Sequence, residues 1–365
     1  MVIGVDASRA FVKDPAGPEY YSLNLIKNLA KIDKHNRYIL YLRPGQKANF
    51  RLPHNFEAKI INFPFLWTQI GLAAETLLKP PAVIFVPAHT LPLLTRIFRP
   101  RLPIVVTIHG LEGKYLPQSG NLLAHIYRNW SIGWAVKFAH RLIAVSEDTQ
   151  KDILKTYQID AKKIQVIHEG VDEGQFSKTT GQNIHYRFKT FILFVGTIQP
   201  RKNLIRLIKA FSMLPQKDLG LVIAGKLGWL YGKILESPKR FGVEDRVVFL
   251  GRVSDSELPG LYKKAKVFVI PSLTEGFGLP ILEAQAAGVP VVASKKGALP
   301  EVAGKGALFV NPKSVKSIRS GLMRAFVPKV RQDLIRKGKE NLGRFSWKKT
   351  AYNTLNFLEK LKAGP

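Results

Sequence analysis

Two glutamates bracket a glycine-rich turn in the second half of the chain. Glu275 directly precedes Gly-Phe-Gly-Leu-Pro (residues 276–280), and Glu283 follows soon after. Glycine lets a ligand approach the backbone closely, and proline suits the first turn of a helix. The turn follows an apolar run, Val267–Ile270, that is typical of a buried strand. Both carboxylates are therefore expected to border one pocket. Taken singly, Glu283 would be an ordinary acid of a first helical turn and Glu275 an acid of a loop.

Two adjacent cations occupy a similar place earlier in the chain. The apolar run Phe191–Val195 leads into Gly-Thr-Ile-Gln-Pro-Arg-Lys-Asn (residues 196–203), and a helical pattern begins at Leu204. Arg201 and Lys202 thus precede a helix N-terminus, where backbone N–H groups and the helix dipole attract anions. This arrangement suits a phosphate or diphosphate. The alternative is a solvated turn that is basic because the whole protein is basic.

A histidine marks the corresponding place in the first half. His109 directly follows the apolar run Ile104–Ile108, and ligands of open parallel sheets bind beyond the carboxyl ends of the strands. A single histidine at such a position is more often structural than functional. His89 follows another strand-like run and is predicted to be structural or to lie on the acceptor side.

Two successive arrays of strands and helices position these residues. Short, β-branched runs alternate with helix-length segments, which is typical of parallel strands buried on both faces. A polar break at residues 171–185 is interpreted as an interdomain linker. We therefore predict an α/β protein with two Rossmann-like, doubly wound domains that face each other across a cleft. The predicted strands are 2–5, 38–42, 58–62, 83–86, 104–108, 141–145, 164–167, 190–195, 219–224, 246–250, 267–270, 289–293 and 307–310.

The stretch from Glu275 to Ser294 carries a family resemblance. Its sequence, Glu-Gly-Phe-Gly-Leu-Pro-Ile-Leu-Glu-Ala-Gln-Ala-Ala-Gly-Val-Pro-Val-Val-Ala-Ser, resembles the Glu-x7-Glu region of retaining GT-B glycosyltransferases, specifically glycosyltransferase family 4. The resemblance covers nearly the whole chain and is greatest to bacterial mannosyltransferase-like members. It extends over residues 3–8, 85–92, 105–109, 144–146 and 196–203.

The resemblance implies a reaction and roles for the residues of the second half. It implies retaining transfer of a hexose from a nucleotide-diphosphate sugar to a glycan or lipid-linked acceptor, with GDP-mannose as the first donor to test and UDP-sugars next. Glu283 would bond the ribose hydroxyls, and Glu275 would contact the donor sugar. Arg201 and Lys202 would stabilise the diphosphate leaving group. Backbone N–H groups of Gly276, Phe277, Gly278 and Leu279 would hold the sugar and diphosphate.

The resemblance also assigns the domains. Residues 1–175 would form the acceptor-side domain, with His109 against the donor sugar and Gly17 in a loop that faces acceptor and phosphates. Residues 176–346 would bind the nucleotide-sugar donor. Residues 347–365 would form an amphipathic helix that packs back toward the N-terminal domain.

Three segments depart from the family pattern. Thr197 stands where many members have arginine, and Arg201 is expected to supply the missing charge. Residues 16–19 read Ala-Gly-Pro-Glu instead of a double-glycine loop. His-Glu-Gly-Val-Asp (residues 168–172) replaces the commoner Pro-Asn-Gly-Val-Asp.

The absence of cysteine limits the possible chemistry. It excludes a disulfide scaffold, a cysteine zinc site, an iron–sulfur cluster and a cysteine nucleophile. No Asp-x-Asp motif follows an apolar strand, and Asp255-Ser-Glu257 is better interpreted as helix capping. In this fold class, cationic side chains and helix N-termini act where other enzymes use a divalent metal. We therefore predict no metal and no cofactor beyond the donor substrate.

The charge leaves a second function open. The formal net charge is +30, of which +8 falls on residues 1–175 and +22 on residues 176–365. Such a surface favours polyanions, so the alternative is a non-catalytic protein that binds nucleic acid or anionic membrane. Aromatic residues are not interleaved with the basic ones, so no specific nucleic acid is expected. Without a signal peptide or a long apolar run, the chain is expected in the cytoplasm, with peripheral association at the inner face of the membrane as a further expectation.

Overall fold

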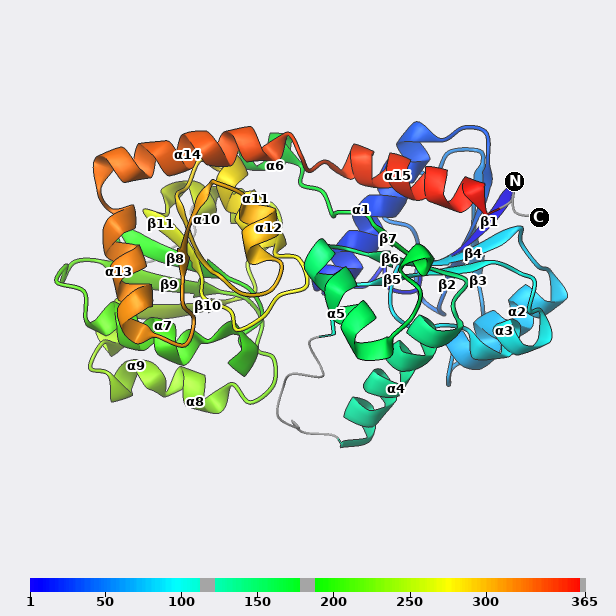
Figure 1. Cartoon of the computed structure of the whole chain (residues 1–365), viewed down its shortest axis with the longest axis horizontal. Helices are drawn as coiled ribbons and strands as arrows, with labels where there is room; N and C mark the ends of the chain where they lie inside the picture. The colour runs from blue at the N-terminus through cyan, green and yellow to red at the C-terminus, as the bar shows by residue number, and fades with distance from the viewer. Residues whose placement is uncertain (112–121, 178–187, 362–365) are drawn as a thin grey trace. The chain divides into compact units, whose positions relative to one another are not determined.

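The computed structural model describes residues 1–111, 122–177 and 188–361, which form two compact units (Figure 1). The first unit contains residues 1–111, 122–170 and 347–361, and the second contains residues 171–177 and 188–346. The second unit therefore begins at residue 171, whereas the sequence placed the domain boundary after residue 175.

The expected linker at residues 171–185 contains regular structure. Helix α6 (Glu173–Ser177) lies within it, and the ring of Phe176 packs edge-on against Tyr262 with 5.8 Å between the ring centroids. The prediction of a plain linker was therefore wrong for these residues. The part of the expected linker from residue 178 to 185 lies outside the described residues.

The described residues of the first unit contain a seven-stranded parallel sheet with strand order β3-β2-β1-β4-β5-β6-β7. The strands are β1 (Val2–Asp6), β2 (Arg37–Leu42), β3 (Phe56–Ile60), β4 (Val83–Val86), β5 (Ile104–Ile108), β6 (Arg141–Ala144) and β7 (Ile164–Val166). The helices and turns are α1 (Gly17–Ile32), the π-helical turn η1 (Thr68–Leu72), α2 (Ala73–Leu78), α3 (Leu93–Phe98), α4 (Leu122–Phe138), α5 (Glu147–Tyr157), η3 (Ala161–Lys163) and α15 (Trp347–Lys360).

The second unit repeats this plan with six described strands in the order β10-β9-β8-β11-β12-β13, again all parallel. The strands are β8 (Phe191–Val195), β9 (Gly220–Ala224), β10 (Val247–Gly251), β11 (Val267–Ile270), β12 (Val291–Ser294) and β13 (Ala307–Val310). Besides α6, the helices and turns are η4 (Pro200–Lys202), α7 (Leu204–Ser212), α8 (Gly232–Leu235), α9 (Ser237–Arg240), η5 (Glu244–Arg246), α10 (Leu258–Lys264), α11 (Leu279–Ala286), α12 (Leu299–Ala303), α13 (Val315–Ala325) and α14 (Pro328–Leu342).

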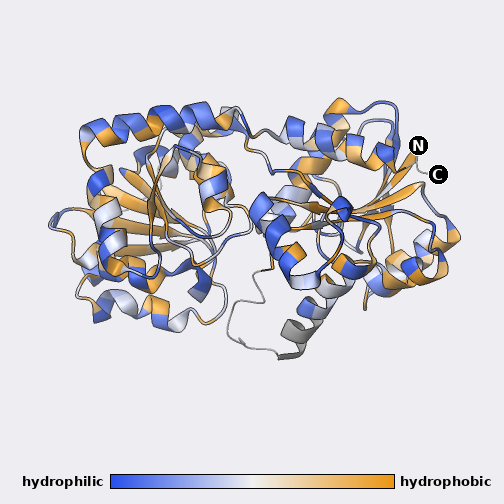
Figure 2. Cartoon of the chain, viewed as in Figure 1, coloured by the Kyte–Doolittle hydropathy of each residue, from blue (hydrophilic) through white to orange (hydrophobic). Residues whose placement is uncertain are grey.

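Burial on both faces explains why the strands consist of unbroken apolar residues. Every residue of β4, β5 and β11 is buried, and helices cover both sides of each sheet. Figure 2 shows the same division, with apolar strands inside and polar residues on the outer faces of helices such as α14. The predicted fold of two doubly wound parallel sheets is confirmed.

Each sheet has one point where the strand order reverses direction. In the first unit β1 lies between β2 and β4, and in the second unit β8 lies between β9 and β11. Loops that leave neighbouring strands in opposite directions open a crevice at the carboxyl ends, which is where ligands of such sheets bind. The second-unit crevice therefore lies between the segments that follow β8 and β11.

Helix α15 belongs to the first unit although it follows the second unit in sequence. It packs along α1, where the indole of Trp347 touches the rings of Tyr20 and Tyr21 (Figure 1). The Thr350 hydroxyl donates a hydrogen bond of 2.8 Å to the carbonyl of His168. Among the described residues, the chain therefore leaves the first unit at residue 171 and returns to it at Trp347.

Candidate active site

The two cations after β8 lie on a short turn that is tightly fixed. Asn203 ends the turn η4 in the left-handed conformation, with a φ of 61°. Its side-chain amide donates to the carbonyls of Pro271 (2.9 Å) and Pro312 (2.7 Å). Because asparagine adopts this conformation more readily than most residues, the turn can end there and α7 can begin at once. Arg201 and Lys202 are thereby held at the crevice in the sheet.

Glu275, which follows β11, forms ion pairs with both of these cations. Its Oε2 lies 2.5 Å from Nη1 of Arg201, and its Oε1 lies 2.6 Å from Nζ of Lys202. Arg201 also donates to the carbonyl of Thr274 at 2.8 Å. All three charged side chains are buried. The segments after β8 and β11 thus meet through side-chain charges at the point where the topology predicts a ligand.

The charges of this trio depend on one another. Burial by itself raises the pKa of Glu275, but Arg201 and Lys202 beside it lower the pKa well below its usual range. Glu275 is therefore ionised throughout the physiological range, and it neutralises part of the charge of the two cations. A phosphate that enters here would contact cations that are already desolvated and oriented.

A close backbone approach shapes the turn that carries Glu275. Gly297 has a φ of 66°, and a Cβ atom there would lie 2.7 Å from both the backbone N and O of Glu275. Gly278 has a φ of 116° and directly precedes α11. Only glycine fits both positions without strain. The first N–H groups of α11 follow this turn, as an anion-binding turn requires.

Glu283 lies on α11 but not in its first turn. The helix begins at Leu279, so Glu283 is its fifth residue, and the interpretation of this side chain as a first-turn acid is wrong. The Tyr262 hydroxyl donates a 2.7 Å hydrogen bond to Oε2 of Glu283. Burial raises the pKa of Glu283 to about 7, and this hydrogen bond opposes part of that rise. Sequence reasoning missed Tyr262, because nothing near it in sequence ties it to α11.

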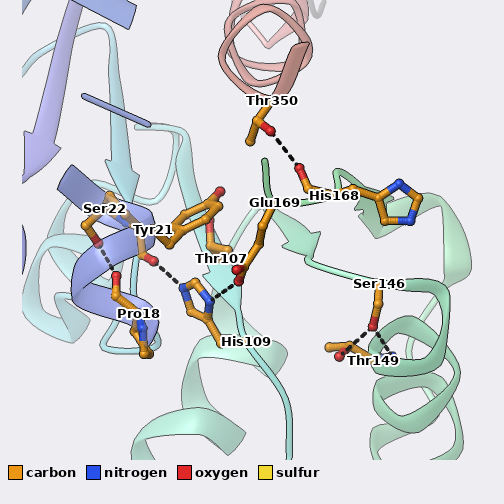
Figure 3. A network of polar contacts seen from close by, with 11 residues as sticks. Pro18, Tyr21, Ser22, Thr107, His109, Ser146, Thr149, His168, Glu169 and Thr350 are labelled. Carbon is orange, nitrogen blue, oxygen red and sulfur yellow. Dashed lines mark hydrogen bonds and ion pairs between the residues drawn. The ribbon is translucent and has the colours of Figure 1, made fainter. Parts of the chain in front are cut away.

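His109 directly follows β5, as predicted, and its ring is enclosed by residues of the first unit (Figure 3). Nε2 lies 2.8 Å from the carbonyl oxygen of Pro87, so this nitrogen donates a hydrogen bond. Nδ1 lies 3.2 Å from Oε1 of Glu169, which is buried. The ring of Tyr21 packs edge-on against the imidazole with 4.7 Å between centroids. Both ring nitrogens therefore face protein groups.

Glu169 is the second residue that sequence reasoning missed. It follows β7 in the segment 168–172, where its acidic side chain departs from the commoner asparagine. That departure was the available signal. Its partner is 60 residues away in sequence, so no local pattern indicates the pair.

Gly17 is the first residue of α1, the helix that follows β1 in the chain. A Cβ atom at this position would meet nothing within 4 Å. The following turn is fixed by Glu19, which accepts a hydrogen bond from the backbone N–H of Ala16 (3.1 Å) and forms an ion pair with Arg9 (2.9 Å). Gly17 therefore leaves open space at the start of this helix.

Only some of the predicted site residues therefore contact one another in the structure. Arg201, Lys202 and Glu275 form one cluster, and Glu283 lies on the helix that follows the same turn. His109 and Gly17 belong to the other unit. Within the part of the chain that the structure describes, no group of three or more histidine, aspartate or glutamate side chains could hold a metal ion. Metal independence stays a prediction.

Comparison with protein families gives two matches that together span most of the chain. The family described as Glycosyltransferase Family 4 matches residues 15–175, and the family described as Glycosyl transferases group 1 matches residues 178–341. The chain is 30% identical over 263 residues to the O-antigen chain mannosyltransferase RfbU of Salmonella typhimurium. That match covers 71% of this chain and 70% of RfbU.

Solved structures show the same fold at low sequence identity. Sucrose-phosphate synthase from Thermosynechococcus elongatus superposes with a TM-score of 0.80 at 19% identity, over 100% of this chain and 99% of that one. HepE of Anabaena, in complex with UDP-glucose, gives a TM-score of 0.75 at 18% identity, over 98% and 99% of the two chains. These likenesses agree with a GT-B fold. Among the described residues, no helix is both long enough and apolar enough to cross a membrane.

Proposed function

The chain belongs to glycosyltransferase family 4, and from that premise we propose that it transfers a hexose from a nucleotide-diphosphate sugar to a glycan or lipid-linked acceptor. We propose further that the reaction retains the anomeric configuration and needs no metal. GDP-mannose is the proposed donor to test first, and UDP-sugars come next. The alternative of a non-catalytic polyanion-binding protein is not favoured, because both halves of the chain match glycosyltransferase families.

The observation that carries this proposal is the buried cluster of Arg201, Lys202 and Glu275. Transfer of a sugar breaks its bond to the diphosphate, so negative charge grows on the departing phosphate while positive charge develops at the sugar. Arg201 and Lys202 are cations held ready for the first charge, and Glu275 is an anion for the second. The cluster lies at the crevice between β8 and β11, where this type of sheet binds ligands.

The neighbouring residues suit the rest of a nucleotide sugar. The carboxylate of Glu283 can accept hydrogen bonds from two adjacent ribose hydroxyls, and Tyr262 holds it in place. Backbone N–H groups of residues 276–279 at the start of α11 can hold the sugar and diphosphate. In the first unit, His109 is proposed to lie against the donor sugar, oriented by Pro87 and Glu169.

The proposed sugar and acceptor rest on relatives. RfbU is an O-antigen chain mannosyltransferase, and HepE was solved with UDP-glucose. The first supports mannose and a glycan acceptor for this chain. The second supports a nucleotide sugar as the donor class and keeps uridine donors in the test.

The test measures release of nucleoside diphosphate from GDP-, UDP- and ADP-sugars in the presence of EDTA, with a glycan or lipid-linked acceptor mixture added. We expect turnover of one donor and a loss of at least about a hundredfold in Glu275→Ala, because an electrostatic group at the reacting centre is removed. Glu340→Ala is the matched control, since Glu340 also forms an ion pair with an arginine but is exposed. Turnover that vanishes in EDTA and returns with Mg²⁺ would contradict metal independence. Full activity in Glu275→Ala would contradict the assigned site.

A further inference from the structure

The imidazole of His109 lies between two hydrogen-bond acceptors of the first unit. The carbonyl oxygen of Pro87 lies 2.8 Å from Nε2, and Oε1 of Glu169 lies 3.2 Å from Nδ1. Both distances are within the range of N–H···O hydrogen bonds. A neutral imidazole carries one proton and can donate from one nitrogen only. The ring can therefore bond both acceptors only if a second proton is present.

The second proton belongs between Nδ1 of His109 and Oε1 of Glu169. A carbonyl oxygen has no proton to give, so the hydrogen bond to Pro87 requires a proton on Nε2. A neutral ring beside an ionised carboxylate would then place two lone pairs against each other in a buried place. An imidazole is a stronger base than a carboxylate, so the proton resides on Nδ1 and the ring carries a positive charge. The pair as a whole is neutral.

The surroundings of Glu169 make His109 its source of positive charge. Glu169 is 4% exposed, and a buried carboxylate without a partner is strongly unfavourable. In the described part of the chain, no lysine or arginine forms an ion pair with it. Tyr21, whose ring packs on the imidazole, stays neutral because burial and the nearby Glu169 both raise its pKa. The other titratable neighbour is His89, with 5.6 Å between the two ring centroids. Figure 3 shows Tyr21 and Glu169 beside the imidazole.

Backbone contacts fix the segment that carries Glu169. The carbonyl of His168 accepts a 2.8 Å hydrogen bond from Thr350 on α15. Two residues after Glu169, Val171 forms an isolated parallel bridge with Ser346. The carboxylate therefore reaches the imidazole from a backbone that is held on both sides of it. A partner fixed in this way sets the orientation of an imidazole as well as the nitrogen that is protonated.

The commoner residue at position 169 would give a different result. Asparagine, which occurs there in the Pro-Asn-Gly-Val-Asp form of the segment, has an amide that can donate to Nδ1 and leave the ring neutral. The ionised carboxylate of Glu169 can only accept. Replacement of the amide by a carboxylate therefore reverses the direction of one hydrogen bond and adds one proton to the ring.

We propose that Glu169 is a positioning residue that holds His109 as a doubly protonated, cationic ring, so that neither nitrogen is available as a base or a nucleophile. In the proposed reaction, the ring acts on the donor sugar through its position and its charge, which Glu169 balances. The proton of the acceptor hydroxyl must then pass to a group other than His109. This part of the inference rests on the proposed function, whereas the protonation of the ring does not.

The test observes the protons of His109 by NMR, without substrates. The full chain is isotope-labelled at its eight histidines, and the signals of His109 are identified by their absence in His109→Phe. At about pH 7.5, where an ordinary histidine is mostly neutral, we expect both ring nitrogens of His109 to carry protons. In Glu169→Gln, whose amide can donate to Nδ1, we expect Nδ1 to lose its proton while Nε2 keeps its own.

Turnover of the donor is the second readout. Glu169→Gln should lower kcat by about tenfold or more, because the charge-assisted hydrogen bond that orients the ring is lost. The matched control is Glu75→Gln. Glu75 also forms an ion pair in the first unit, with Lys59 at 2.5 Å, and its replacement should change neither the signals of His109 nor kcat.

A ring nitrogen of His109 without a proton in the wild-type protein would overturn the proposal, and this spectrum decides even if a variant fails to fold. So would a spectrum of Glu169→Gln in which Nδ1 keeps its proton. Full turnover in Glu169→Gln would contradict the positioning role. Wild-type protein that turns over no donor but shows both protons would contradict the proposed function and support the protonation of the ring.

Discussion

At the scale of single residues, Glu275 has one role in the empty site and a second, proposed role when a donor is bound. Without a donor it is the partner of Arg201 and Lys202, and it lets two cations exist in a buried place. A buried charge without a partner is strongly unfavourable, so the glutamate preserves the site while it is empty. In the proposed reaction, a bound diphosphate would provide the cations with a second source of negative charge. The same carboxylate would then stand close to the sugar, where positive charge develops.

The pKa of Glu283 predicts how donor binding depends on pH. Burial raises this pKa to about 7, so the carboxyl is mostly protonated below that pH and ionised above it. In the role proposed for Glu283, the ionised form accepts hydrogen bonds from ribose hydroxyls, so the affinity for nucleoside diphosphate should fall as the pH drops below about 7 and level off above it. The measurement is the dissociation constant of the nucleoside diphosphate from about pH 5.5 to 8.5.

Two variants separate Glu283 from other titrating groups. Glu283→Gln should bind weakly with little change over this range. Tyr262→Phe removes a hydrogen bond that lowers the pKa of Glu283, so the midpoint of the pH dependence should move upward. An unchanged midpoint in Tyr262→Phe would show that another group controls the binding.

At the scale of elements, the sequence predicted the parts whose signals are local. The strands were predictable because buried parallel strands are unbroken apolar runs, and β11 and β13 have the bounds expected. The start of α11 was predictable from Gly278, which tolerates the positive φ found there, and from Pro280, whose ring restricts φ to a helical value. The family resemblance assigned Arg201, Lys202 and Glu275 to one donor, but the sequence did not predict that their strands, β8 and β11, are neighbours. That the glutamate bonds both cations could not be predicted, since spacing says nothing of side-chain geometry.

The features that were missed depend on contacts distant in sequence. Helix α6 has only five residues, too few for a stable helix in isolation, and it depends on the packing of Phe176 against Tyr262. The pair of His109 and Glu169 joins the segments after β5 and β7. Tyr262 reaches Glu283 from α10. In each case, the sequence around one partner gives no indication of the other partner.

The first turn of α1 provides a test of the role of Gly17. A methyl group at this position meets no atom within 4 Å, so Gly17→Ala should leave the fold intact and change the free energy of unfolding by less than about 1 kcal/mol. If the start of α1 faces phosphates or acceptor, the same methyl group should raise a substrate KM several-fold. The measurements are thermal unfolding and steady-state kinetics for both substrates. Unchanged kinetics with an unchanged melting temperature would show that Gly17 is not part of the substrate-binding site.

At the scale of the whole molecule, the return of the chain to the first unit ties α15 to the elements that carry His109. Trp347 is buried and contacts Tyr20 and Tyr21, and Tyr21 in turn packs against the imidazole of His109. On the other side, Thr350 bonds the carbonyl of His168, the residue before Glu169. Helix α15 thus supports both residues that surround the histidine.

Truncation of Trp347 tests this support. Trp347→Ala should lower the stability of the first unit by about 3–5 kcal/mol, because a large buried side chain is removed and leaves a cavity. The second unit should unfold as before, so two separate transitions are expected in calorimetry. Tyr352→Ala, on the exposed face of the same helix, is the control and should unfold as wild type does. A single transition shifted for the whole protein would contradict the expectation that the two units unfold separately.

The order of folding during synthesis follows from this return. A ribosome completes residues 171–346 before it makes α15, so the second unit has its whole chain while the first still lacks one helix. Domains usually fold in the order of their synthesis. Here the unit that starts first must finish last, and the face of α1 that Trp347 covers stays open to chaperones until then. Chains truncated after residue 346 and released from the ribosome should therefore resist protease in the second unit and be cut in the first.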